Sequence, residues 1–238
     1  FVVTNVPIGP PLVGFGACMN PYLYAYPNWP GEINEKNVGD LEAKVKELHP
    51  QFVRIFFLNS WWDKDTDPVI AKNHPGMKQS LIRTIKLAQD AGAKVLLQFW
   101  YDPKRYVDPE GVARRFAMTI REMRLKYGLT SIAYVTMQNE PNDEGKDITK
   151  EQYVRLYRGL DKSLRDLGLR QEIQIVGGDL LSPKQTEWFE FMGRELSPVL
   201  EGYAVHAYWQ YWNTAKLGRR VTDTRRDVEA LPEAARKP

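Results

Sequence analysis

A carboxyl group lies in a sequence context suited to catalysis at residues 139–141. The tripeptide Asn139-Glu140-Pro141 follows an apolar run that predicts a β-strand at 132–138. An amide, a carboxyl group and a turn-forming proline therefore come together at the carboxyl end of that strand, where a carboxyl group can act as a general acid or base. The alternative is that Glu140 is a solvated turn residue, held in extended geometry because it precedes proline.

Polar side chains also interrupt two other predicted strands. In the run 202–208, strand alternation puts His206 and Tyr208 on one face, while the intervening residues suit a face covered by a helix. Arg54 lies inside the apolar run 52–58, where an unpaired charge is costly, so we expect a carboxylate beside it. A satisfied core histidine and a structural ion pair would explain the same residues.

Other side chains with metal-binding chemistry lack the rest of a metal site. Asp63, Asp65 and Asp67 alternate in one loop, but the glycine and distal glutamate of an EF-hand loop are absent, so we expect a solvated acidic loop. His49 and His74 have no partners at metal-ligand spacing. We expect no metal and no cofactor.

Tryptophan is concentrated where loops are expected. Of the seven tryptophans, only Trp188 lies in a predicted helix. The others fall in or just before loops that follow predicted strands, where they could stack on pyranose rings or plug the top of the core. Their common rim favours a carbohydrate-binding cleft, to which we expect Trp100 and Trp209 to contribute directly. The rim tryptophans are Trp29, Trp61, Trp62, Trp100, Trp209 and Trp212.

The elements that must position these groups recur at a regular spacing. Short apolar runs rich in β-branched and aromatic residues start about 40 residues apart, and each is followed by a loop and a segment with helical periodicity. This spacing fits a strand, a helix and two loops per unit. The predicted strands are 12–17, 52–58, 94–100, 132–138, 173–178 and 202–208.

The predicted helices carry recognisable start signals. Two starts have capping-box spacing, and two have proline at the first helical position. The signals are Asp108-Pro109, Thr149 with Gln152, and Ser182 with Pro183 and Gln185. The final segment, 222–236, is predicted to be the sixth helix.

The alternation of apolar strands and helices predicts an α/β fold with a parallel sheet buried on both faces. An open dinucleotide-binding sheet is disfavoured, because Gly14 and Gly16 lack a third glycine and a following helix. We therefore predict a (β/α)8 TIM barrel, of which residues 1–238 form a single partial domain. Six of the eight βα units are visible, so we expect either a fragment truncated in the C-terminal part of the barrel or a shortened barrel.

The bulk composition limits the class of protein. With 43% hydrophobic and 26% charged residues, the chain has an ordinary globular composition, and its apolar runs are too short to span a membrane. A net charge of +3 and a basic cluster confined to 219–226 indicate a solvated helix face and no nucleic-acid partner. Cys18 is the single cysteine, which excludes an intrachain disulfide. Localisation stays open with secretion slightly favoured, since any export signal before Phe1 was removed or never present.

The chain resembles glycoside hydrolase clan A in Arg54 on the second predicted strand, Asn139-Glu140-Pro141 on the fourth and His206-x-Tyr208 on the sixth. This clan comprises retaining enzymes on a TIM barrel, among them cellulases, β-mannanases and β-xylosidases, and the resemblance covers almost the whole chain in strand order. It implies that Glu140 is the general acid/base and that Asn139 binds the sugar 2-hydroxyl group of an oligosaccharide or polysaccharide. The residues expected to support the carboxylates and the substrate are Arg54, His206 and Tyr208.

The nucleophile of the clan is a glutamate at the end of the seventh strand, and residues 1–238 contain no seventh predicted strand. Glu195, Glu201, Glu229 and Glu233 fall in helical segments or at a strand entrance, so Asp179, just past the fifth predicted strand, is the least implausible substitute. Retaining hydrolysis needs two carboxyl groups about 5–5.5 Å apart. We therefore expect this polypeptide alone to be inactive unless a complementing C-terminal segment supplies the nucleophile.

Two other functions fit parts of the pattern. A noncatalytic carbohydrate-binding protein derived from a glycosidase barrel would keep the aromatic rim and lack the nucleophile. An aldolase or a phosphate-binding isomerase would need a strand-borne lysine or a late glycine-rich loop. Lys94 begins the third predicted strand, at the end away from the expected site. The retaining glycoside hydrolase is the leading prediction, and the carbohydrate-binding protein is its alternative.

Overall fold

Strands and helices alternate along the chain, which the computed structural model describes at residues 14–25, 36–62, 76–100, 107–143, 148–182, 185–207 and 213–237. The strands are β1 (Gly16–Met19), β2 (Phe52–Phe57), β3 (Lys94–Phe99), β4 (Ile132–Thr136), β5 (Gln174–Leu181) and β6 (Gly202–His206). The helices are α1 (Val38–Leu48), α2 (Asn59–Trp62), α4 (Met77–Asp90), α5 (Pro109–Tyr127), α6 (Lys150–Asp166), α7 (Thr186–Glu195), α8 (Thr214–Glu229) and the short 3-10 helix η2 (Glu233–Ala235).

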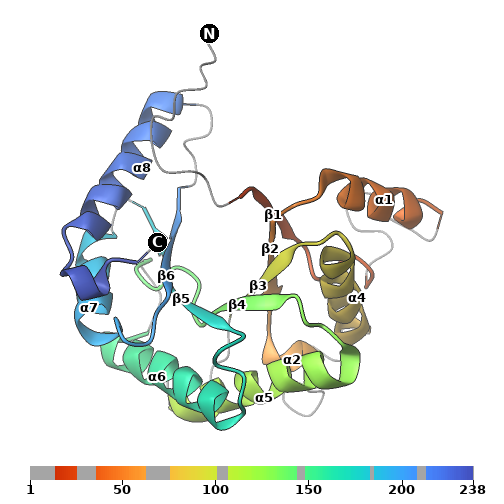
Figure 1. The fold of residues 1–238 in the computed structure, drawn as a ribbon, viewed down its shortest axis with the longest axis horizontal. Helices are drawn as coiled ribbons and strands as arrows, with labels where there is room; N and C mark the ends of the chain where they lie inside the picture. The colour runs from red at the N-terminus through yellow and green to blue at the C-terminus, as the bar shows by residue number, and fades with distance from the viewer. Residues whose placement is uncertain are drawn as a thin grey trace.

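The described strands form one parallel sheet in the order β1-β2-β3-β4-β5-β6. The sheet curls, and the helices follow its outer side from α1 and α4 round to α7 and α8 (Figure 1). Because all strands run in the same direction, their carboxyl ends meet along one rim. The described residues therefore form a curled half-barrel of alternating strands and helices, and they do not close an eight-stranded barrel.

The alternation of β2 shows how the two faces of the sheet differ. Val53, Ile55 and Phe57 are fully buried in the main hydrophobic core, which also contains residues of α4 and α5. Burying each such side chain stabilises the fold by about 1.5–3 kcal/mol. Phe52 and Arg54 point the other way and line the hollow inside the curl. The helix-covered face of the sheet thus packs into the hydrophobic core, and the face toward the hollow can carry polar residues such as Arg54.

Two of the predicted helix starts are confirmed. Asp108 caps α5, since its Oδ1 atom accepts a hydrogen bond of 2.9 Å from the Gly111 N–H, and Pro109 is the first residue of the helix. Thr149 and Gln152 form a complete capping box at the start of α6. These caps satisfy N–H groups that the first turn of a helix leaves without an intrahelical partner.

The predictions for the two later helices are wrong in detail. Ser182 does not cap α7, because its Oγ atom accepts a hydrogen bond of 2.9 Å from Arg220 and the helix starts without a side-chain cap. The segment predicted as one helix at 222–236 is divided between the end of α8 and the short helix η2. α8 is the last described α-helix. It starts earlier because Asn213 caps it, with Oδ1 accepting a hydrogen bond of 3.0 Å from the Lys216 N–H.

Two strand boundaries also differ from the prediction. The first strand is Gly16–Met19 and not 12–17, of which residues 12 and 13 lie outside the described part. The fifth strand continues past the predicted end at residue 178 to Leu181. Asp179 therefore lies within β5 and not after it.

Two kinds of feature are absent from the described residues. No described helix is both long and apolar enough to cross a membrane. No cluster of three or more histidine, cysteine, aspartate or glutamate side chains in the described ranges could hold a metal ion.

Candidate active site

Glu140 lies at the carboxyl end of the central strand β4 with an unusual backbone conformation. Its φ angle is 48°, in the left-handed region that costs a non-glycine residue about 1–2 kcal/mol. Its N–H donates a hydrogen bond of 3.0 Å to the carbonyl oxygen of Asp179 on β5. The alternative of an extended, solvated turn residue is wrong, because the side chain is only 15% exposed and faces another side chain.

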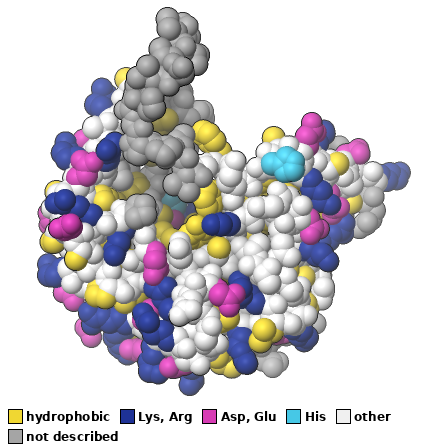
Figure 2. All heavy atoms as spheres, viewed as in Figure 1, with side chains coloured by type: hydrophobic (Ala, Val, Ile, Leu, Met, Phe, Trp, Pro, Cys, Tyr) yellow, Lys and Arg dark blue, Asp and Glu magenta, His cyan; other side chains and the backbone are white. Residues whose placement is uncertain are grey.

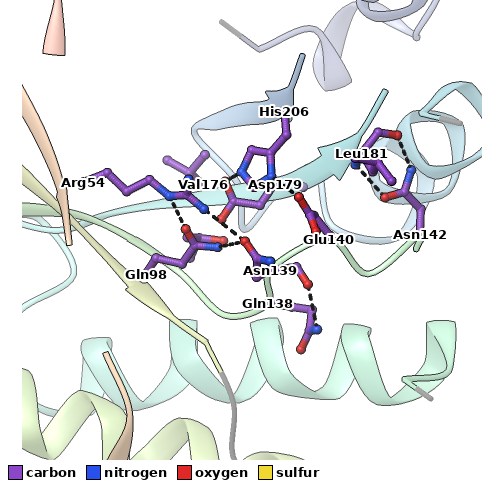
Figure 3. A network of polar contacts seen from close by, with 12 residues as sticks. Arg54, Gln98, Gln138, Asn139, Glu140, Asn142, Val176, Asp179, Leu181 and His206 are labelled. Carbon is purple, nitrogen blue, oxygen red and sulfur yellow. Dashed lines mark hydrogen bonds and ion pairs between the residues drawn. The ribbon is translucent and has the colours of Figure 1, made fainter. Parts of the chain in front are cut away.

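The imidazole ring of His206 lies between two carboxyl groups. Nδ1 is 2.8 Å from Oε1 of Glu140, and Nε2 is 3.2 Å from Oδ1 of Asp179 (Figure 3). The side chains of His206 and Asp179 are almost fully buried. Three residues from the ends of β4, β5 and β6 are therefore linked in one row on the hollow side of the sheet.

A second network holds the residue before Glu140. Nη2 of Arg54 and Nε2 of Gln98 both donate to Oδ1 of Asn139, at 3.0 and 2.9 Å, and Nε of Arg54 contacts Oε1 of Gln98 (Figure 3). The expectation of a carboxylate beside Arg54 is wrong for the described residues, where amide oxygens accept its hydrogen bonds. Because both donors converge on Oδ1, the Asn139 amide is oriented with its NH2 group on the other side.

The turn after Glu140 is tied to β5 as well. Nδ2 of Asn142 donates to the carbonyl oxygen of Leu181 at 2.8 Å, and the N–H of Leu181 donates to Oδ1 of Asn142 at 2.7 Å. The side-chain amide of Asn142 thus replaces a backbone partner for β5. Together with the bond from the Glu140 N–H, this pair fixes the rim between β4 and β5.

The sequence analysis did not predict the role of Gln98 or the contact between Asp179 and His206. Gln98 is fully buried within the apolar strand β3, and a polar residue at a buried strand position was the signal that could have found it. Asp179 was considered only as a substitute nucleophile. The ring of His206 lies between it and Glu140, so it does not face Glu140 across an open gap as a retaining nucleophile would.

The other described carboxylates considered as substitutes make structural contacts. Glu201 lies before β6, where it contacts Arg170 and accepts a hydrogen bond of 2.7 Å from the Ile175 N–H. Glu195 ends α7 and lies 3.5 Å from Arg158. Glu229 ends α8 and accepts a hydrogen bond from Arg225. Each of these three carboxylates is part of an ion pair, and Glu201 also lines the hollow inside the curl. The fourth, Glu233, lies in η2, after α8.

The described tryptophans differ in their exposure, and two of those predicted for the rim are buried. Trp61 and Trp62 are buried in α2, and Nε1 of Trp62 donates to Glu122 at 2.8 Å, so both are structural and not part of a sugar-binding rim. Trp100 is 40% exposed and packs on Phe56, with ring centroids 5.0 Å apart. The predicted residues Tyr208, Trp209, Trp29 and Trp212 lie outside the described residues.

The hollow of the curled sheet contains a cavity of about 510 Å³. Figure 2 shows the notch between the two arms of the molecule, with hydrophobic side chains along its inner wall. The lining of the cavity includes Arg54 but neither Glu140 nor His206, so the cavity is separate from the row of polar residues. The lining comes from all strands of the sheet and includes Cys18, Phe52, Leu96, Tyr134, Val176 and Tyr203.

Comparison with known proteins gives a clear result for the fold only. No family model matches the sequence. No curated protein matches it either. Among solved structures, a bacterial orthologue of human α-L-iduronidase aligns with a TM-score of 0.62 at 13% identity, covering 91% of this chain and 38% of that one.

Two GH39 enzymes align with slightly lower TM-scores. The GH39 enzyme from Xanthomonas axonopodis pv. citri aligns with a TM-score of 0.59 at 12% identity, covering 92% of this chain and 48% of that chain. A GH39 β-xylosidase from Caulobacter crescentus aligns with a TM-score of 0.57 at 13% identity, over 92% and 50%. The chain thus spans half or less of the length of these proteins. Over that part it has the fold of the clan A glycoside hydrolases, as the motifs on its strands predicted.

Proposed function

We propose that this chain carries the acid/base residue of a retaining glycoside hydrolase that acts on β-linked glycosides. The observation that carries the proposal is the position of Glu140. Its carboxyl group lies at the carboxyl end of the central strand, 2.8 Å from a histidine and next to an asparagine held by two donors. Carboxyl ends of barrel strands are where such enzymes keep their catalytic groups.

Each residue of the site has a role in this proposal. Glu140 protonates the glycosidic oxygen in the first step and removes a proton from water in the second. The NH2 group of Asn139 donates to the 2-hydroxyl group of the sugar, and Arg54 and Gln98 hold that amide in place. The exposed face of Trp100 stacks on a sugar ring. Tyr208 and Trp209 remain predicted substrate contacts.

We further propose that the barrel is completed by two more βα units, the first of which supplies the nucleophile. Barrel interiors are filled with side chains, so a hollow of about 510 Å³ inside the curl is suited to side chains from further strands. A second, largely apolar groove of about 570 Å³ lies between β6 and α8 and includes Tyr203, Val205 and Val221. A seventh strand paired with the edge of β6 would cover both surfaces.

Reading the gene beyond the codon for Pro238 tests the completion of the barrel. A further strand ending in glutamate would support the proposal, and a stop codon directly after this codon would contradict it. The purified chain 1–238 is expected to hydrolyse no aryl β-glycoside, because one carboxyl group is not enough for double displacement. Hydrolysis by this chain that disappears in Glu140→Gln would show that the second carboxyl group lies within it.

Activity of the completed barrel tests the role of Glu140. Glu140→Gln is expected to lower kcat/KM about 10²–10⁴-fold for a glycoside with a poor leaving group, the range typical of general acid–base catalysis. The loss in the glycosylation step should be much smaller for a dinitrophenyl glycoside, whose leaving group needs no proton. An equal loss for both substrates would contradict the assignment. Glu122→Gln, on the outer side of α5, is the matched carboxylate control.

A carbohydrate-binding protein is the second candidate. It is favoured by the lack, among the described residues, of a carboxylate that faces Glu140 across an open gap. Such a protein would bind an oligosaccharide without cleaving it, and Trp100→Ala would weaken that binding. Calorimetric titration with xylo- and mannooligosaccharides, followed by product analysis, separates the candidates, since binding without turnover by the completed protein supports the binder.

A further inference from the structure

Asp179 is the inserted residue of a β-bulge beside the candidate acid/base. β5 and β6 pair Gly178 with Ala204 and Leu180 with Val205, which leaves Asp179 without a partner in the ladder. Its φ angle is 51° and that of Gly178 is 98°. A Cβ atom at residue 178 would lie 2.6 Å from the Ala204 carbonyl oxygen, so glycine is required there. Bulges near functional sites redirect side chains, and this one directs a carboxyl group at the imidazole ring of β6 (Figure 3).

This placement is unfavourable for Asp179 itself. The side chain is 2% exposed, and Oδ2 is buried without a hydrogen-bond partner among the described residues. An unsatisfied buried polar atom costs about 1–3 kcal/mol. The left-handed backbone of a non-glycine residue costs a similar amount, about 1–3 kcal/mol. Packing alone would not select this carboxyl group, and its one described side-chain contact is with Nε2 of His206.

Counting hydrogens assigns the direction of the contact with Asp179. The row Glu140–His206–Asp179 has two gaps, and each requires one hydrogen. Asp179 is the more buried carboxylate, and Nε2 is its one described side-chain partner, so a ring N–H belongs on Nε2. Nδ1 then faces Oε1 of Glu140, and these two atoms share the hydrogen of the other gap.

We propose that Asp179 is a positioning residue for Glu140. By accepting the hydrogen bond from Nε2, it fixes the orientation of His206, so that Nδ1 stays directed at Oε1 of Glu140. This inference rests on the proposed function of Glu140 as acid/base. The contact between Nδ1 and Oε1 holds the carboxyl group of Glu140 at the rim, in one position for both of its proton transfers.

Nitrogen-15 NMR of the ring tests the link without any need for turnover. The chain has three histidines, so the ring signals of the purified protein can be assigned with His49→Gln and His74→Gln. In the wild type, Nε2 of His206 should give the signal of a protonated nitrogen. Asp179→Asn should lose that state in favour of the Nδ1–H tautomer, because the neutral amide is a weaker acceptor and can offer its own NH2 group. Asparagine tolerates the left-handed backbone, so this variant should fold.

Asp227→Asn is the matched control, since Asp227 is a buried carboxylate that accepts hydrogen bonds from Gln185 and Thr186 on the outer side. It should leave the His206 signals unchanged. A wild-type ring in the Nδ1–H form would overturn the inference even if Asp179→Asn failed to fold. So would an unchanged ring in a folded Asp179→Asn. If the ring behaves as expected while Glu140→Gln keeps full activity, the proposed function fails and the link between Asp179 and His206 stands.

Discussion

Gln98→Leu removes the centre of the network that holds the rim of the sheet. Gln98 is fully buried, donates to Asn139 at 2.9 Å and accepts from Nε of Arg54. Leucine has a similar volume, so no large cavity forms, and the cost comes from hydrogen bonding. A neutral hydrogen bond contributes about 0.5–1.5 kcal/mol and one from a charged group about 1.5–3 kcal/mol, which gives a loss of about 2–4.5 kcal/mol.

Urea unfolding followed by circular dichroism measures this loss. The midpoint should fall while the dependence on denaturant concentration stays the same, because the surface exposed on unfolding does not change. Gln174→Leu, at the exposed start of β5, is the control and should stay within about 0.5 kcal/mol of the wild type. A Gln98→Leu protein as stable as this control would refute the view that amide groups hold Arg54 and Asn139.

Three further substitutions test other contacts. Burial raises the pKa of Asp161, but hydrogen bonds from Arg165 and Arg170 outweigh it and hold the pKa below 3.8. This stabilisation is present above pH 3.8 and is lost as the pH falls through the folded-state pKa. In urea titrations, Asp161→Asn should therefore be less stable than the wild type at pH 7. Its free energy of unfolding should also fall less than that of the wild type between pH 7 and pH 3. Burial raises the pKa of Tyr157 from 10.0 to about 12. The free energy of unfolding should therefore fall as the pH rises between these two values. Tyr157→Phe should remove this decrease from the alkaline unfolding curve. Trp62→Phe should cost about 1–3 kcal/mol in thermal unfolding, because it leaves a gap beside a buried ring and removes the indole N–H that donates to the partly exposed Glu122 carboxylate.

The sequence predicts the order of strands and helices well because each element has a local cause. The apolar run that forms β2 and the capping box at Thr149 depend on near neighbours only. Ser182 has the spacing of a cap, but a guanidinium group from α8 is its partner, and no local rule contains that contact. The start of α8 is likewise set by the cap at Asn213, which precedes the start predicted at residue 222.

The candidate site is predictable in its residue types and not in its contacts. Asn139, Glu140 and His206 follow from strand ends and alternation, and the structure brings them together. The partner of Arg54 was not predictable, because an amide on a neighbouring strand satisfies a guanidinium group as well as a carboxylate does. Asp179 depends on a bulge between β5 and β6. Glycine at residue 178 was a local signal for the bulge, but the irregular register with β6 is a tertiary feature.

Azide rescue of Glu140→Ala tests the central claim most directly. In the barrel completed by the nucleophile, a dinitrophenyl β-glycoside forms the glycosyl intermediate without an acid, and the missing base then limits turnover. Azide needs no base, so it should raise the rate of Glu140→Ala and give a β-glycosyl azide, while the wild type is unaffected. No effect of azide on this variant, or an α-glycosyl azide as product, would contradict the assignment of Glu140 as the acid/base of a retaining enzyme.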